Sequence, residues 1–124
     1  MATRRQRKVA HLIQQEVSGL IATKVRDPRV AGVTVTGVEV SADLRIANIY
    51  VSRLGHEEER QAALAGLMAA AGYLRRELAP RVELRFMPEL RFHLDRSWEQ
   101  GARIDELLDR IAAEQSTPGE SEEE

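Results

Sequence analysis

Residues 33–52 read VTVTGVEVSADLRIANIYVS, and this stretch decides the architecture. Its valines, isoleucines and threonines alternate with other residues on both sides of a turn at Ala42 and Asp43. A period of two in β-branched residues is typical of half-buried strands. We therefore predict an antiparallel hairpin whose strands cover residues 33–41 and 44–52.

Each predicted strand directs one set of side chains toward the core. In the second strand Ala47, Ile49 and Val51 share one face, because successive side chains of a strand point to opposite sides. In the first strand the apolar positions change parity across Gly37. We expect a β-bulge at this glycine, because one extra residue restores the inward register.

A helix is predicted before the hairpin. Thr3 and Gln6 have the spacing of a capping box, and apolar residues then recur every three or four positions. These residues are Val9, Leu12, Ile13, Val17, Leu20, Ile21 and Val25. The pattern indicates about six helical turns. The helix should end at Asp27, because the residue before Pro28 is disfavoured in helical conformation, and residues 29–32 should form a loop.

Two helical segments and a third strand are predicted after the hairpin. The glutamates at 57–59 place negative charge in a first helical turn, where the macrodipole favours it. We expect this helix to bend or break at Gly72 and its second piece to end at Pro80. A strand should follow late in residues 81–95, where three apolar residues alternate: Leu90, Phe92 and Leu94.

The C-terminal residues predict one more helix and then a disordered acidic tail. Ser97 and Gln100 have capping-box spacing, and apolar residues at helical spacing follow them. These are Ile104, Leu107, Leu108 and Ile111. From Gln115 onward the composition cannot bury apolar surface. We therefore place the folded domain at residues 1–113 and the tail at residues 114–124.

The predicted order is helix, strand, strand, helix, bent helix, strand, helix. Three strands with grouped helices favour a two-layer α+β fold, with a right-handed connection wherever strands run parallel. The 124 residues are 43% hydrophobic and 31% charged, which suits one domain with one core.

Charge is distributed unevenly along the chain. Residues 1–53 carry 9 basic and 4 acidic side chains, residues 54–110 carry 9 and 11, and residues 111–124 carry 0 and 5. The local charges are +5, −2 and −5, which sum to the net charge of −2. A basic first half predicts a polyanion-binding face. Arginine, at 16 against 2 lysines, favours phosphate recognition, although a GC-rich genome would produce the same bias.

The sequence lacks the motifs of the common enzyme classes. It has no cysteine, so disulfides, thiolate nucleophiles and thiolate metal sites are excluded. No P-loop, G-x-G-x-x-G or G-x-S-x-G motif occurs, and the three histidines are isolated. We expect no catalytic site, cofactor or metal. The basic start is followed by no continuous apolar stretch, so we expect a cytoplasmic protein with no export or membrane-spanning segment.

The helix and strand order, with a glycine between the paired helices, resembles that of a type II KH domain. No two glycines lie three apart, so the G-x-x-G loop that clamps nucleic-acid backbone is absent, and Ala70-Ala71-Gly72 stands in its place. Several further segments resemble the ribosome-binding factor A family over residues 5 to about 111. They are residues 26–30, 33–41, 43–44, 50–52, 88–92 and 95–97.

This resemblance implies a non-enzymatic bacterial assembly factor that binds the free, immature 30S subunit. It implies a monomer that contacts 16S rRNA and assists maturation of its 5′ end, including in the cold, with assembly GTPases as further candidate partners and no membrane. In that family an A-x-G kink replaces G-x-x-G, and here it falls on Ala70, Ala71 and Gly72. Family basic residues correspond to Arg7, Lys8, Arg75 and Arg76.

The candidate RNA-binding residues combine the basic clusters with this kink. They are Arg4, Arg5, Arg7, Lys8, Lys24, Arg26, Arg29, Arg45, Ala70, Ala71, Gly72, Arg75 and Arg76. Positive charges at a helix start oppose the macrodipole by roughly 0.3–1 kcal/mol each, so a phosphate partner would explain them, while the alternative is a solvated helix end. The kink could equally be a packing device. A rival function is a protein-interaction module that docks on a ribosomal protein or an assembly GTPase.

Overall fold

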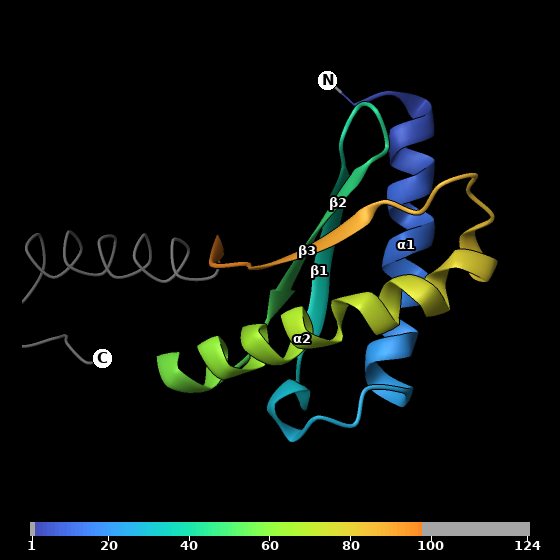
Figure 1. The fold of residues 1–124 in the computed structure, drawn as a ribbon. Helices are drawn as coiled ribbons and strands as arrows, with labels where there is room; N and C mark the ends of the chain where they lie inside the picture. Colours follow the sequence, from blue (N-terminus) through green and yellow to red (C-terminus); the bar gives the residue numbers. More distant parts are fainter. Residues whose placement is uncertain (1, 98–124) are drawn as a thin grey trace, which may run out of the picture.

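The computed structural model describes residues 2–97, which form two long helices and one three-stranded sheet (Figure 1). In chain order the elements are α1 (Arg4–Thr23), the 3₁₀ helix η1 (Pro28–Val30), β1 (Thr34–Val40), β2 (Ile46–Ser52), α2 (Glu57–Val82) and β3 (Glu89–Leu94). The α+β class predicted from the sequence is confirmed. The predicted C-terminal helix and acidic tail lie outside the described residues, apart from Ser97.

The sheet has the order β1-β2-β3, with β2 in the centre. β1 and β2 are antiparallel, which confirms the hairpin, and β3 is parallel to β2. The register passes from the pair Val35 and Val51 to the pair Gly37 and Tyr50. Thr36 is therefore the extra residue of the predicted bulge, and its hydroxyl donates to the Tyr50 carbonyl at 3.2 Å.

The turn of the hairpin is longer than predicted, because β2 begins at Ile46 rather than at Leu44. The Ser41 hydroxyl oxygen accepts hydrogen bonds from the backbone N–H groups of Arg45 and Ile46, at 3.1 and 3.0 Å. Leu44 has a φ of 60° in the left-handed region, which no strand residue adopts. At the start of the predicted second strand, these hydrogen bonds to Ser41 therefore take the place of backbone hydrogen bonds between β1 and β2.

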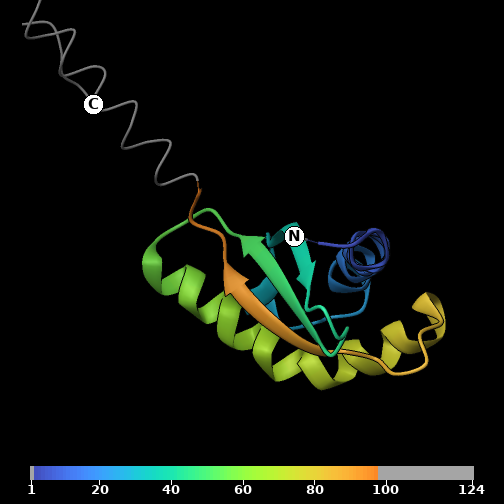
Figure 2. The same cartoon turned by 90° about the horizontal axis from the view of Figure 1, so that it is seen from above.

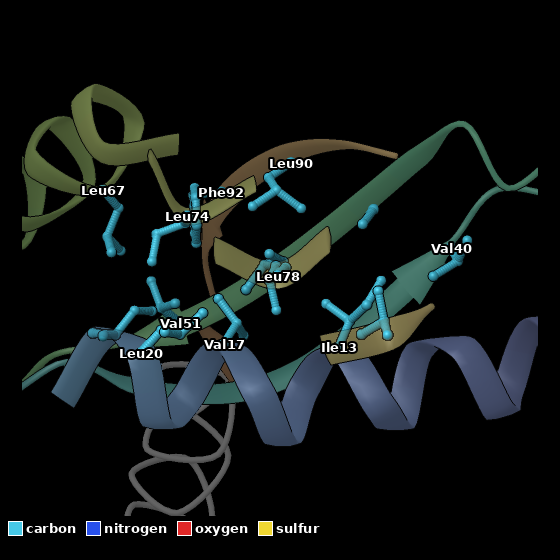
Figure 3. Close-up of a cluster of buried hydrophobic side chains, with 14 of the residues drawn as sticks. Ile13, Val17, Leu20, Val40, Val51, Leu67, Leu74, Leu78, Leu90 and Phe92 are labelled. Carbon is cyan, nitrogen blue, oxygen red and sulfur yellow. The ribbon is translucent and has the colours of Figure 1, made fainter. Parts of the chain in front are cut away.

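Both helices cover the same face of the sheet, and the core lies between them and the strands (Figures 2 and 3). Ala47, Ile49 and Val51 of β2 are completely buried, whereas the residues between them are only half-buried. α1 contributes five buried residues, Val9, Ile13, Val17, Leu20 and Ile21. Buried residues therefore recur with a period of two in β2 and of about 3.6 in α1, as the sequence predicted.

α1 ends earlier than predicted. Its last residue is Thr23, Lys24 caps it, and the chain is no longer helical when it reaches Asp27. The carboxylate of Asp27 accepts the backbone N–H of Arg29 at 2.9 Å and caps η1, so part of the predicted loop forms one turn of 3₁₀ helix. Aspartate is favoured at such a capping position because its carboxylate oxygen can accept a hydrogen bond from a nearby backbone N–H.

α2 is one helix, so a break at Gly72, one of the two predicted alternatives, is wrong, whereas a bend there stays a prediction. Buried residues recur at intervals of four and seven on both sides of that glycine: Ala63, Leu67, Leu74 and Leu78. This continuous buried row holds the helix against the sheet, and packing of this kind contributes most of a helix's stability. Pro80 does not end the helix either. It lies in the last turn, and α2 continues to Val82 before Glu83 adopts a left-handed φ of 50°.

Candidate nucleic-acid interface

Three segments far apart in the sequence meet at one end of the sheet (Figures 1 and 2). They are the start of α1, the hairpin turn and the loop of residues 83–88 between α2 and β3. β2 and β3 are parallel and start at this end, with Ile46 beside Glu89. The backbone N–H of Glu89 donates to the Arg45 carbonyl at 2.8 Å, so the turn and the loop are joined directly.

A cleft of about 580 Å³ opens between these segments. Its lining residues are Arg5, Asp43, Leu44, Arg45, Arg75, Leu84, Arg85, Phe86, Met87 and Glu89. Four of them are arginines and two are acidic, which leaves a formal charge of +2 on the cleft walls. An arginine-lined concavity of this kind attracts phosphate and carboxylate groups, because guanidinium groups make planar, bidentate contacts with both. We refer to it below as the arginine cleft.

The two acidic residues of the arginine cleft are already engaged by neighbouring groups. Asp43 accepts the Ser41 hydroxyl at 2.7 Å and the backbone N–H of Arg45 at 3.1 Å, and these bonds lower its pKa. The ion pair with Arg91, at 2.9 Å, lowers the pKa of Glu89. Both carboxylates are charged at neutral pH, but their charges are directed to protein donors.

Arg5 is positioned by the residue that follows it. The side chain of Gln6 accepts the Thr3 backbone N–H at 2.8 Å, while the Thr3 hydroxyl accepts the Gln6 backbone N–H at 3.1 Å, which confirms the predicted capping box. The side-chain amide of Gln6 also donates to the Val40 carbonyl at 2.9 Å. Gln6 thereby attaches the first turn of α1 to the end of β1 and holds Arg5 beside the hairpin turn.

Arg75 has a structural role that the sequence did not indicate. Its Nε donates to the Pro88 carbonyl at 3.1 Å and its Nη2 to the Met87 carbonyl at 2.8 Å. The guanidinium group therefore ties α2 to the loop before β3. Pro88 itself is completely buried, so the loop is fixed at this end.

The structure brings only some of the predicted site residues together. Arg5, Arg45 and Arg75 line the arginine cleft. Arg4, Arg7 and Lys8 are exposed in the first two turns of α1, where Arg7 donates to the Ala2 carbonyl at 2.9 Å. A 20-residue helix is about 30 Å long. Lys24, Arg26 and Arg29 follow the far end of α1 and belong to a separate region.

The remaining candidates differ in how accessible their side chains are. Arg29 forms an ion pair with Asp27 at 2.6 Å, which raises the pKa of Arg29 and lowers that of Asp27. Ala70 and Ala71 are half-buried against the core, whereas Gly72 and Arg76 are exposed on α2. The residues of the predicted kink therefore face in different directions within one helix.

Sequence reasoning missed Arg85 and Phe86, which complete the arginine cleft. Phe86 is 77% exposed, and Arg85 Cζ lies 5.7 Å from the centroid of its ring. Both lie in a loop, where neither helical nor strand periodicity applies. The nearest indication is the position of Pro88, because the loop before a strand lies at the end of the sheet where that strand starts.

Within residues 2–97 no group of three or more histidine or acidic residues is placed to hold a metal ion. In the same part of the chain no helix is long and apolar enough to cross a membrane.

The fold and the arginine cleft define a small two-layer α+β domain with a basic end. The chain belongs to the ribosome-binding factor A family, whose sequence model matches residues 5–108. Ribosome-binding factor A from Thermosynechococcus vestitus is 51% identical to it over 120 residues, covering 94% of this chain and 95% of the relative. The protein of that name from Brevibacillus brevis is 47% identical over 117 residues, covering 94% and 93%. These relatives are not members of a known enzyme family.

Solved structures share the same fold. The crystal structure of ribosome-binding factor A from Thermus thermophilus matches with a TM-score of 0.64 and 29% identity, covering 72% of this chain and 94% of that one. The solution structure of a Thermotoga maritima protein described as a putative ribosome binding factor A matches with a TM-score of 0.66 and 35% identity, covering 75% and 89%. The two-layer arrangement is therefore that of the family.

Proposed function

We propose that the protein binds the immature 30S ribosomal subunit by placing the arginine cleft on phosphates of 16S rRNA. The observation that carries this proposal is the convergence of Arg5, Arg45, Arg75 and Arg85 from separate segments on one concave surface. A homology model of ribosome binding factor A (RbfA) from Thermus thermophilus was fitted into the cryo-EM map of a 30S–RbfA complex; it is 29% identical to this chain, with a TM-score of 0.56, and covers 77% of this chain and 97% of its own. We therefore take the 30S subunit as the binding partner of this chain as well.

The finer function follows from the family resemblance. The protein assists maturation of the 5′ end of 16S rRNA and late subunit assembly, including at low temperature, as a cytoplasmic monomer that catalyses no reaction. The order of helices and strands supports a KH-like ancestry, with Ala70, Ala71 and Gly72 at the place of the G-x-x-G loop. Assembly GTPases remain candidate partners. A strain without the protein should accumulate 16S precursors with unprocessed 5′ ends in the cold.

Binding to the subunit tests the interface directly. The double variant Arg5→Gln/Arg45→Gln should weaken co-sedimentation with purified 30S subunits, because both guanidinium groups lie in the cleft. Its affinity should also depend less on salt. The slope of the logarithm of the binding constant against the logarithm of the salt concentration should become shallower by up to about 0.9 for each phosphate that is no longer neutralised. The matched control is Lys24→Gln/Arg26→Gln, which removes the same charge at the far end of α1. If only the control pair weakens binding, the interface lies at that other end.

The rival function, docking on a ribosomal protein or an assembly GTPase, is favoured by one feature of α2. Met68 is 59% exposed on that helix, and exposed large apolar side chains are common in protein interfaces. Subunit binding that Met68→Gln weakens, and that salt and the cleft variants leave unchanged, would support this rival.

A further inference from the structure

We propose that the arginine cleft holds a single unpaired nucleotide of RNA, with its base stacked on Phe86 and its phosphates on Arg5 and Arg45. This inference rests on the proposed function and adds the class of RNA that the cleft selects. Its starting point is the aromatic ring, because 77% of Phe86 is exposed in a cleft whose other lining residues are four arginines, two acidic residues and three half-buried apolar residues. Phosphate binding requires cations and does not explain why an aromatic ring is exposed in the cleft.

The backbone of the loop is restrained on both sides of Phe86. On one side of it, Met87 and Pro88 offer their carbonyl oxygens to Arg75, at 2.8 and 3.1 Å. On the other side, Glu83 ends α2 in the left-handed conformation and turns the chain toward β3. A backbone restrained in this way loses less freedom on binding than a mobile loop does, so contact with Phe86 costs less ordering of the chain.

The chemistry around the ring suits a nucleobase. The guanidinium carbon of Arg85 lies over the Phe86 ring, 5.7 Å from its centroid, a cation–π arrangement that adds a second planar, polarisable group to the site. Leu84 and Met87 line the same cleft and are half-buried. Aromatic rings and arginine planes are the groups on which proteins stack unpaired bases, and any base can stack because each has a π-face.

The size and charge of the cleft agree with one nucleotide. Its volume of about 580 Å³ lies within the range of roughly 300–1,000 Å³ that small-molecule sites occupy. Arg5 and Arg45 supply cations to the walls of the same cleft, while Asp43 and Glu89 are engaged by the Ser41 hydroxyl, the Arg45 backbone N–H and the Arg91 side chain. A base inside a duplex is already stacked on its neighbours and cannot enter, so the cleft selects nucleotides in loops, bulges or ends.

A titration of the full chain with small probes separates base recognition from phosphate recognition. The probes are AMP and ribose 5-phosphate, which differ only by the base, and the readout is the amide spectrum of ¹⁵N-labelled protein. We expect AMP to shift amides of residues 84–87 and ribose 5-phosphate to leave them largely unchanged. In Phe86→Ala the two probes should give the same pattern. Identical patterns in the unmodified protein, or no shifts at this loop, would overturn the proposal.

Binding to 30S subunits then asks whether the nucleotide belongs to ribosomal RNA. Phe86→Ala should weaken the affinity for 30S subunits by about 5- to 150-fold, the range that loss of one stacked base produces, while Phe86→Tyr should retain it. The slope against salt should stay unchanged, because no cation is removed. The matched control is Leu54→Ala, since Leu54 is 90% exposed at the other end of β2.

Each combination of results decides between the alternatives. If the Arg5→Gln/Arg45→Gln variant weakens subunit binding and Phe86→Ala does not, the cleft binds phosphates without stacking and only this inference fails. If neither variant has an effect, the proposed function fails as well. If Phe86→Ala weakens subunit binding but AMP leaves residues 84–87 unshifted, the ring contacts a ribosomal protein and the nucleotide inference is overturned. An AMP site with unchanged subunit binding would indicate a soluble mononucleotide and would also overturn it.

Discussion

Gly66 in α2 lies directly against Val30 in η1, so closely that a β-carbon on the glycine would stand 2.9 Å from Val30 Cγ2. The same β-carbon would lie 3.2 Å from Asp27 Oδ2. Val30 is buried and β-branched, and Asp27 is held by Arg29, so neither neighbour can easily move. The absence of a side chain at position 66 therefore lets the segment between α1 and β1 pack on α2.

Gly66→Ala is expected to destabilise the fold. Overpacking a well-packed contact typically costs about 1–3 kcal/mol, which exceeds the roughly 1 kcal/mol that alanine gains over glycine inside a helix. Gly72→Ala is the matched control, because its β-carbon would meet only Arg76 Nη1 at 3.7 Å, the end of a flexible side chain. It should stabilise by about 0.5–1 kcal/mol. Urea denaturation of both variants measures the two changes, and destabilisation of equal size would contradict this account.

The two glycines also show what sequence patterns could and could not predict. The capping box at Thr3, the bulge at Gly37 and the buried positions of α1 and β2 were predicted because each depends on residues near in sequence. Gly66 was missed and a break at Gly72 was wrongly allowed, because a glycine inside a helix has the same local pattern whether or not another element packs on it. The contacts of Gly66 with Asp27 and Val30 distinguish the two glycines, and these residues lie 39 and 36 positions away in the chain.

The candidate site could be predicted only in part, for a similar reason. Arg5 and Arg45 were predicted from charge and Arg75 from the family resemblance, but their convergence depends on the parallel pairing of β2 and β3, which places the hairpin turn beside the loop of residues 83–88. The same charge criterion selected Arg29, whose side chain is bound to Asp27. Phe86 has no periodic context, and only its exposure in the folded chain indicates a role.

Arg75→Lys should loosen the loop before β3. Lysine keeps the positive charge but cannot donate in the fixed geometry that reaches both the Met87 and Pro88 carbonyls. We expect a decrease of about 0.5–1.5 kcal/mol in the free energy of unfolding, corresponding to one hydrogen bond, and faster hydrogen exchange in the loop. Arg76→Lys is the control, because Arg76 is exposed and donates no hydrogen bond within residues 2–97. Equal exchange rates in the two variants would show that Arg75 does not anchor the loop.

Deletion of residues 114–124 should leave the thermal midpoint nearly unchanged. This segment contains no large apolar side chain, so its removal should leave the core intact. Differential scanning calorimetry of the full and shortened chains measures the effect. A fall of several degrees would show that the segment docks on the folded domain. The deletion also removes five acidic residues, so subunit binding should become no weaker.

The stability of the domain should depend on acid through Glu57 at the start of α2. Hydrogen bonds from Arg96, and further ones from Gln61 and Arg60, lower its pKa from 4.5 to about 2. Because the carboxylate is more acidic in the folded state, its stabilising effect is complete above about pH 4.5 and is lost as the pH falls toward 2. In urea denaturations across this range, Glu57→Gln should lose stability with falling pH less steeply than the unmodified protein. The control is Glu58→Gln, which removes a carboxylate that forms no ion pair within residues 2–97, and its stability should change with pH as that of the unmodified protein does. Parallel curves of stability against pH for all three proteins would exclude Glu57 as the source of the acid dependence.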